Sequence, residues 1–118
     1  MAEKKGYVAT SKFLIASPTK VRPVAHVINQ KSYTEAMAIL ANMPQKGATL
    51  ISATLKSAAA NALNQNSKLD EDMLYVKEIR VDEGPRLKRV WFRARGRADQ
   101  LLKRMCHITV IVDEMAGE

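Results

Sequence analysis

The chain has little cysteine and few aromatic residues: Cys106 stands alone, and aromatic residues make up 5% of the sequence. A single cysteine excludes a disulfide framework within the chain and favours a reducing compartment such as the cytoplasm. With so few aromatics, the core is expected to consist mainly of Ala, Leu, Ile, Val and Met. The 118 residues are enough for one domain with one core.

Long apolar runs are also absent. The N-terminal stretch MAEKKGYVATSKF has basic residues with no apolar region after them, so it does not indicate a secretory signal. The longest apolar runs fall far short of a membrane span. We therefore expect no membrane partner.

No pattern in the sequence supports catalysis or metal binding. His26 and His107 lie singly in apolar patterns, where a partly buried structural role is expected, and with Cys106 they do not form a four-ligand set. Cys106 opens an apolar strand, so it should be packed rather than nucleophilic. Residues 70–72 are acidic and could bind a divalent ion, but a solvated loop or helix cap is the simpler interpretation. We expect no cofactor, no metal and no enzymatic activity.

Positive charge is abundant, and it is concentrated in one segment. The net charge is +7, and residues 84–106 hold eight basic residues against one acid, Asp99, while the rest of the chain carries equal numbers of each sign. The eight are Arg86, Lys88, Arg89, Arg93, Arg95, Arg97, Lys103 and Arg104. This local excess predicts a polyanionic partner for the segment.

The first helix is predicted to begin at Ser17, as N-cap, with Pro18 at the first helical position. Its apolar stripe consists of Val21, Val24, Ala25 and Ile28. Pro23 removes a backbone hydrogen bond, so it should kink this helix or delay its start.

Two more helices are predicted to follow. Ser32 and Glu35 form a capping box for the second, whose apolar face is Ala36, Ile39, Leu40 and Met43. The third covers about residues 44–65 and is rich in alanine, which indicates close packing against a sheet or another helix. Its periodic positions are Ile51, Leu55, Ala58, Ala59, Ala62 and Leu63. Residues 64–72 break the pattern and are expected to form a loop.

Three segments are typical of strands. Residues 7–16 predict a short first strand, and residues 73–83 and 106–114, which are rich in β-branched side chains, should pair as an antiparallel hairpin. The apolar positions change parity between Val76 and Ile79, which predicts a β-bulge or burial on both faces. In the last strand, one face should carry Ile108, Val110 and Val112.

The connection between the last two strands is far longer than the two to five residues typical of a hairpin. It could be a solvated flexible loop with Trp91 and Phe92 against the body, and residues 97–105 could form an amphipathic helical turn. Alternatively, the two strands continue outward as an arm. Two large aromatics among eight cations suit a solvated loop poorly, so we favour the arm.

The residue types of this arm suit folded RNA. In an extended strand, Arg93, Arg95 and Arg97 would lie on one edge, roughly 6.6 Å apart. Guanidinium groups bind phosphates and stack on bases, and Trp91 and Phe92 offer flat faces to unpaired bases. Gly96, between Arg95 and Arg97, permits a bend.

Several motifs together carry a family resemblance. They are Asp82-Glu83-Gly84-Pro85, Lys88-Arg89, Arg93-Ala94-Arg95, Gly96-Arg97-Ala98-Asp99, Lys103-Arg104 and His107-Ile108-Thr109, with KVR at 20–22 and SAAANA at 57–62. Over about residues 7–113 the chain resembles the bacterial large-subunit ribosomal protein twenty-two family. It differs from that family at Pro23, where an aliphatic residue is usual, and at Trp91-Phe92, where a smaller residue and Pro are common.

The resemblance implies an α+β fold, with three helices packed on a small antiparallel sheet and a long protruding β-hairpin. It implies a single ribosomal protein domain, with a body at about 7–83 and 105–114 and an arm at about 84–104. The implied function is structural: the protein binds large-subunit ribosomal RNA of the 23S type, supports subunit assembly, and lines the nascent-peptide exit tunnel with its hairpin tip. The implied partners are this RNA, neighbouring large-subunit proteins and the nascent peptide, with the chain a monomer within the ribosome.

The resemblance also identifies residues expected to contact RNA. They are Lys20 and Arg22 in the body, and Arg86, Lys88, Arg89, Trp91, Phe92, Arg93, Arg95, Arg97, Lys103 and Arg104 in the arm. The positions matching the family's tip run from about Arg86 to Arg95.

Two other functions are compatible with the residues alone. One is a non-ribosomal nucleic-acid-binding protein that reads DNA with a β-ribbon, which would prefer duplex DNA to ribosomal RNA. The other is an enzyme that cleaves RNA with a metal held by residues 70–72. No base or nucleophile lies beside those acids in the sequence, so the second is the weaker alternative.

Overall fold

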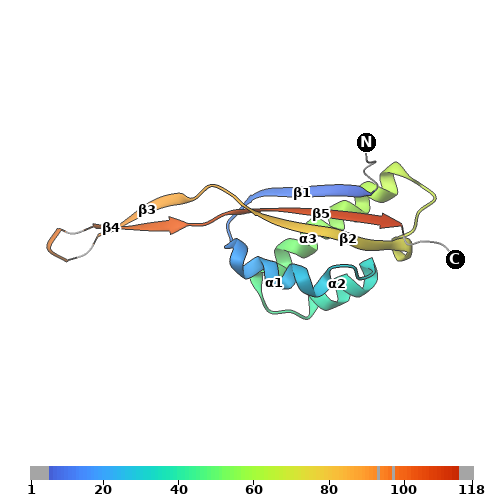
Figure 1. The fold of residues 1–118 in the computed structure, drawn as a ribbon, viewed down its shortest axis with the longest axis horizontal. Coiled ribbons are helices and arrows are strands. Elements are labelled where there is room, and N and C mark those ends of the chain that lie inside the picture. The colour runs from blue at the N-terminus through green and yellow to red at the C-terminus, as the bar shows by residue number, and fades with distance from the viewer. Residues whose placement is uncertain (1–5, 93, 97, 115–118) are drawn as a thin grey trace.

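A computed structural model describes residues 6–92, 94–96 and 98–114 of the chain. The elements are β1 (Tyr7–Leu14), α1 (Pro18–Ile28), α2 (Tyr33–Ala41), α3 (Lys46–Gln65), a 3-10 helix at Glu71–Met73, β2 (Leu74–Glu83), β3 (Leu87–Phe92), a 3-10 turn at Ala94–Gly96, β4 (Ala98–Lys103) and β5 (Cys106–Glu114). The three helices gather on one side of a sheet formed by β1, β5 and β2, and β3 and β4 project from one end of it (Figure 1). The predicted α+β class is confirmed.

The molecule is long for its size because of this projection. Its principal extents are 69 × 35 × 21 Å, and the ribbon of β3 and β4 reaches well beyond the body (Figure 1). We call residues 84–104 the arm and the remaining described residues the body.

The sheet of the body is antiparallel, with β5 between β1 and β2. The predicted pairing of the last two body strands is confirmed, from Leu74 opposite Glu114 to Glu83 opposite Cys106. Between Val76 and Glu78 the register shifts by one residue, which leaves Lys77 as the additional residue of a bulge. Because of this additional residue, the apolar side chains before and after the bulge face the same core, which explains the change of parity in the sequence.

The core lies between the sheet and the helices. α3 packs on β1 and β5, and α1 packs on β2. Ile28, Ile51, Leu55, Leu74, Ile108, Val110 and Val112 have no exposed surface. Four alanines of α3, Ala48, Ala58, Ala59 and Ala62, are buried as well, which allows its backbone to approach its neighbours closely, as the sequence predicted.

One buried residue of α3 is polar and has no signal in the apolar pattern. Thr54 is 1% exposed. Its hydroxyl lies 2.8 Å from the Ser11 hydroxyl and donates to the Leu50 carbonyl at 3.1 Å. These bonds satisfy the hydroxyl and connect α3 to β1.

The predicted helix starts are partly confirmed. Ser32 caps α2 by accepting from the Glu35 amide at 3.3 Å. Ser17 occupies the cap position of α1, but its side chain makes no capping bond, and only its carbonyl accepts from the helix. Of the two effects expected of Pro23, a kink or a delayed start, the delayed start is wrong, because α1 begins at Pro18 and continues through Pro23. Pro23 is exposed, so its ring needs no space in the core.

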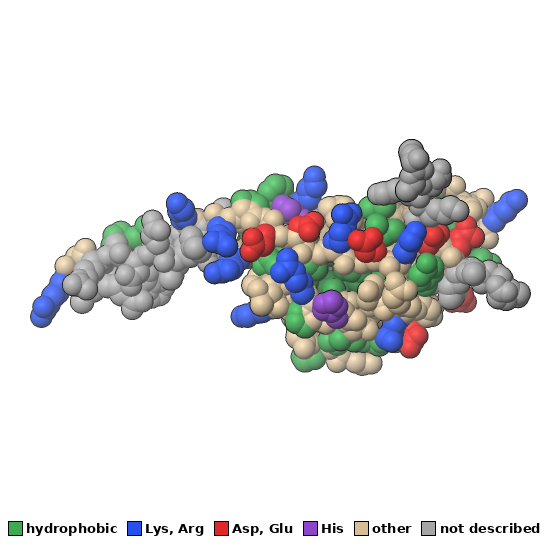
Figure 2. Space-filling model, in the orientation of Figure 1, with side chains coloured by type: hydrophobic (Ala, Val, Ile, Leu, Met, Phe, Trp, Pro, Cys, Tyr) green, Lys and Arg blue, Asp and Glu red, His purple; other side chains and the backbone are tan. Residues whose placement is uncertain are grey.

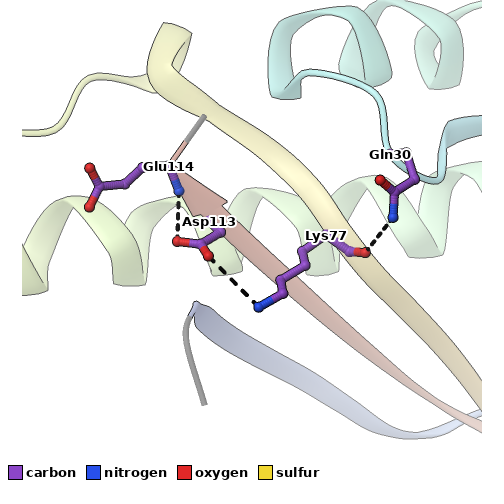
Figure 3. Close-up of polar contacts among 4 residues, drawn as sticks. All are labelled: Gln30, Lys77, Asp113 and Glu114. Atoms are coloured by element: carbon purple, nitrogen blue, oxygen red, sulfur yellow. Dashed lines mark hydrogen bonds and ion pairs between the residues drawn. The ribbon is translucent and has the colours of Figure 1, made fainter. Parts of the chain in front are cut away.

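The outer edge of β2 is covered by the connection between α1 and α2. The Val76 carbonyl accepts from the Gln30 amide at 3.0 Å, and the Val76 amide donates to the Lys31 carbonyl at 2.8 Å. Beside them the Gln30 side chain donates to the Lys77 carbonyl at 3.2 Å, while the Lys77 ammonium lies 3.8 Å from Asp113 (Figure 3). These bonds pair backbone groups that an open edge would leave unpaired.

Candidate nucleic-acid interface

The arm is a two-stranded antiparallel ribbon. β3 and β4 form a sheet of their own, paired from Leu87 opposite Lys103 to Phe92 opposite Ala98. The predicted continuation of the strands is therefore confirmed. A flexible loop and a helical turn at residues 97–105 are both excluded for the arm, since Ala98–Lys103 is a strand.

One side of β3 presents apolar surface to solvent. Lys88, Val90 and Phe92 alternate along the strand and therefore point to the same side. Val90 is 56% exposed and Phe92 79% exposed, beside the exposed Lys88. An exposed aromatic ring on the same side of a strand as a cation suits RNA, because the ring stacks on an unpaired base while the cation meets phosphate.

The chain reverses at Ala94–Gly96, which forms the tip of the arm. Arg95 and Gly96 have positive φ angles of 65° and 73°, so the predicted bend at Gly96 is confirmed. The prediction that Arg95 lies in an extended strand is wrong, because this residue belongs to the turn. The tip is also shorter than the resemblance implies: Arg86 lies at the opposite end of β3, 3.7 Å from the Glu83 carboxylate.

The other predicted arm residues are distributed along the ribbon. Lys103 ends β4 and Arg104 follows it, and both are exposed. Arg89 and Trp91 belong to β3, but their side chains are outside the described part of the structure, as are Arg93 and Arg97 entirely. Basic side chains gather where the arm leaves the body and recur at its tip, whereas basic and acidic side chains alternate along the body (Figure 2).

The two predicted body residues differ in their surroundings. Lys20 is exposed on α1. Arg22, two residues on, donates from Nε and Nη2 to the Val81 carbonyl, at 3.2 and 2.9 Å. These bonds join α1 to β2, so Arg22 has a structural role that the sequence did not predict.

The root of the arm, where Gly84 meets Met105, contains a ring pair without a predicted role. The Gly84 amide donates to the Met105 carbonyl at 2.8 Å, and a Cβ on Gly84 would lie 3.1 Å from the His107 ring. His107 Nδ1 accepts from the Phe13 amide at 3.0 Å, and the two rings meet edge to face with centroids 4.9 Å apart. Phe13 is nevertheless 57% exposed, which strand alternation gave no reason to expect.

The remaining candidate residues have structural surroundings. His107 is partly buried, as predicted, but His26 is exposed, so the same prediction for His26 is wrong. Cys106 is buried at the start of β5, and burial raises the pKa of its thiol, an effect that Arg22 reduces. The helix-cap interpretation of residues 70–72 is confirmed, since Asp70 accepts from the Glu71 amide at 2.9 Å.

In the described residues, His, Cys, Asp and Glu nowhere form a group of three able to hold a metal ion. In the same part of the chain, no helix is both long enough and apolar enough to span a membrane.

Comparison with known proteins identifies the family. A sequence model of the ribosomal protein L22p/L17e family matches residues 9–113, nearly the whole chain. The chain belongs to this family. The resemblance of the arm motifs is therefore confirmed, and the protein is a structural ribosomal protein rather than a member of an enzyme family.

Curated relatives match over their full or nearly full length. A large ribosomal subunit protein uL22 of Treponema denticola is 75% identical over 118 residues, which cover 100% of both chains. The protein of that name from Treponema pallidum is 60% identical over 114 residues, 97% of this chain and 92% of its own. One from Borreliella afzelii is 53% identical, over 97% of this chain and 95% of its own.

Proposed function

We propose that this protein is a structural component of the large ribosomal subunit that binds large-subunit ribosomal RNA through its arm. The observation that carries the proposal is the arm itself, a cationic ribbon with an exposed Phe92 at 79% and an exposed Arg95 at its turn. The names of the curated relatives, which place those proteins in the large subunit, support it. The single domain then divides into a body at about 7–83 and 105–114 and an arm at about 84–104.

The composition of the ribbon favours RNA over other polyanions. A two-stranded ribbon is too thin to bury its own side chains, so its exposed apolar groups gain contacts only inside a partner. Folded RNA offers dense phosphate for the cations and unpaired bases for the aromatic faces. In this proposal the protein supports assembly of the subunit, because its arm contacts several RNA segments at once and so holds them together.

The proposal also assigns roles beyond RNA binding. Lys20 contacts RNA from the body, and so do the guanidinium N–H groups of Arg22 that are not bonded to Val81. Neighbouring large-subunit proteins contact the rest of the protein surface. The tip at Ala94–Gly96 lines the nascent-peptide exit tunnel, where the exposed Arg95 faces the passing chain. The protein is a monomer within the ribosome, in the cytoplasm.

The RNA role is tested by changing Arg93, Arg95 and Arg97 together to Ala. The affinity for transcribed large-subunit ribosomal RNA should fall, and the slope of log affinity against log salt should decrease by about two to three, since roughly 0.7–0.9 is lost per phosphate contact. The thermal midpoint should stay nearly unchanged. A matched control removes three exposed body cations, Lys56, Lys68 and Arg80, and should change affinity much less.

Unaltered affinity and salt slope in the arm variant would remove the arm from RNA binding. A preference of the unmodified protein for duplex DNA over ribosomal RNA at matched salt would instead support a DNA-binding ribbon. The tunnel role is tested separately with Trp91→Ala and with a lengthened tip in assembled ribosomes. Unchanged nascent-chain stalling and unchanged macrolide sensitivity in both would argue against it.

A further inference from the structure

β1 contains a bulge at the end that lies against the arm root. Ser11 is opposite Ile108 and Leu14 is opposite Cys106, so Lys12 and Phe13 together face the single residue His107. A bulge of this kind turns a side chain out of the normal alternation of the strand. Here it places the phenyl ring of Phe13 outside the core, with 57% of the residue exposed.

The backbone at this bulge is strained. Phe13 has a φ of 59°, in the left-handed region that bulky residues rarely adopt. A glycine or asparagine would adopt it more readily, and the aromatic ring is not buried in return. Residues held in such conformations cluster at functional sites, and the ring of Phe13 is the exposed group at this one.

The bulge also fixes the position of the ring. The Phe13 amide donates to His107 Nδ1 at 3.0 Å, and the ring planes are 82° apart with centroids at 4.9 Å. Because Nδ1 accepts this bond, the neutral imidazole carries its proton on Nε2, which lies on the side of Gly84, 3.3 Å from where a Cβ on that residue would be. No hydrogen bond from Nε2 is found to any residue in the described part of the chain. The site therefore combines an open aromatic ring with an available donor.

Cations lie close to this position along the chain and at the root of the arm. Lys12 precedes Phe13 and is exposed, and the Lys46 ammonium donates to the nearby Ile15 carbonyl at 2.9 Å. On the arm side, Arg86 and Arg104 lie within two residues of the Gly84–Met105 bond that closes the root.

Acidic groups are also present at the root, but one of them is neutralised. Glu83 is paired with Arg86, while Asp82 lies opposite His107 on the neighbouring strand. The positive excess and the single projecting ring fit nucleic acid better than an apolar protein surface, which would need a larger apolar patch.

We propose that Phe13, supported by His107, forms a stacking platform for an unpaired base of the RNA at the root of the arm. This inference rests on the proposed RNA binding and adds a second anchor to it, at the opposite end of the arm from the tip. The base stacks on the phenyl ring, and the Nε2 proton of His107 donates to an oxygen of the same nucleotide.

The test compares two variants at one position. Phe13→Asn removes the ring and suits the positive φ, whereas Phe13→Tyr keeps an aromatic face. Affinity for transcribed large-subunit ribosomal RNA should fall roughly tenfold in the Asn variant, the usual effect of losing one base–aromatic stack, and stay within about twofold of the original in the Tyr variant. The thermal midpoint of the Asn variant should be equal or higher. Val8→Asn, at an exposed apolar position of the same strand, is the matched control and should leave affinity unchanged.

The outcomes separate this inference from the proposed function. If the unmodified protein binds the RNA, the arm variant binds weakly and Phe13→Asn binds normally, the platform is wrong and the RNA role stands. If the unmodified protein does not bind the RNA, both are wrong. If Phe13→Asn binds free RNA normally but enters particles poorly when all subunit proteins are present, the ring contacts a protein, which also overturns the platform.

Discussion

The body and the arm use the same residue types in opposite ways. In the body, large apolar side chains such as Leu55 and Ile108 are fully buried, and charged residues lie on the outside. In the arm, Phe92 and Val90 are more than half exposed, although they alternate along a strand as core residues do. The body is thus stabilised by its own core, whereas the described residues of the arm form two strands without a second layer against them.

This difference shows why a pattern of alternating apolar residues does not identify a core by itself. In β5, alternation places Val110 and Val112 beneath the helices. In β3, the same period produces a ribbon whose apolar side meets solvent. What distinguishes the two is the surrounding sequence: helices are available to cover β5, while β3 and β4 are flanked by cations.

Removing the arm should give the largest effect. Replacing residues 85–104 with a short Asn-Gly turn keeps the Gly84 to Met105 connection at the root. We expect affinity for large-subunit ribosomal RNA to fall by about a hundredfold or more, since several phosphate contacts are lost together. The thermal midpoint should change by a few degrees at most, because the core is retained. Loss of cooperative unfolding in this variant would contradict a body that is stable without its arm.

A pair of truncations compares the two regions directly. Leu55→Ala should lower the free energy of unfolding by about 2–5 kcal/mol, because it opens a cavity in a packed core. Phe92→Ala should change it by less than about 0.5 kcal/mol, because the ring is exposed. Urea titrations of both variants measure the contrast. Equal destabilisation by the two substitutions would mean that the arm has a core of its own.

Two basic residues of α1 sharpen the comparison within the body. Arg22→Ala removes both bonds to the Val81 carbonyl and should cost about 1–3 kcal/mol of stability. Lys20→Ala should cost almost none, since Lys20 is exposed. Both should weaken RNA binding. If Arg22→Ala leaves the unfolding free energy unchanged, the link between α1 and β2 is not structural.

The smallest effect concerns Cys106 and pH. Burial raises the pKa of the folded thiol above its ordinary value of 9.0, so the unfolded chain releases this proton first. The contribution of the neutral Cys106 thiol to the free energy of unfolding is fully present below that ordinary pKa. It is lost as the pH rises through the folded pKa. Relative to Cys106→Ala, the unmodified protein should therefore lose stability between pH 8 and pH 10, by less than about 1 kcal/mol. A difference between the two proteins that does not change with pH would contradict the burial of the thiol.

Much of the fold could be predicted because local and long-range signals agree. The alanines of α3 predicted close packing, which is present, and of the two explanations for the parity change in β2, a bulge or burial on both faces, the bulge is found, at Lys77. The effect of Pro23 within α1 was harder to predict, since a proline is tolerated on an exposed helix surface.

The interface was predictable in its chemistry but less so in its geometry. Charge concentration and arm motifs identify the cationic residues, yet the turn that takes Arg95 out of an extended strand depends on a positive φ that no side-chain pattern encodes. The exposure of Phe13 has the same origin, because in sequence it lies in an ordinary apolar strand. The bonds from Arg22 to Val81 join residues far apart in the chain, and a basic residue on a helix gives no sign of such a partner.

Hydrogen–deuterium exchange of the free protein and of its complex with large-subunit ribosomal RNA tests the contrast between body and arm most directly. The ladder amides of β3 and β4 should exchange rapidly in the free protein and become protected in the complex. Those of β5 and α3 should be protected in both, because the core covers them. Slow exchange of the arm in the free protein, or no added protection of the arm in the complex, would contradict an arm that depends on RNA.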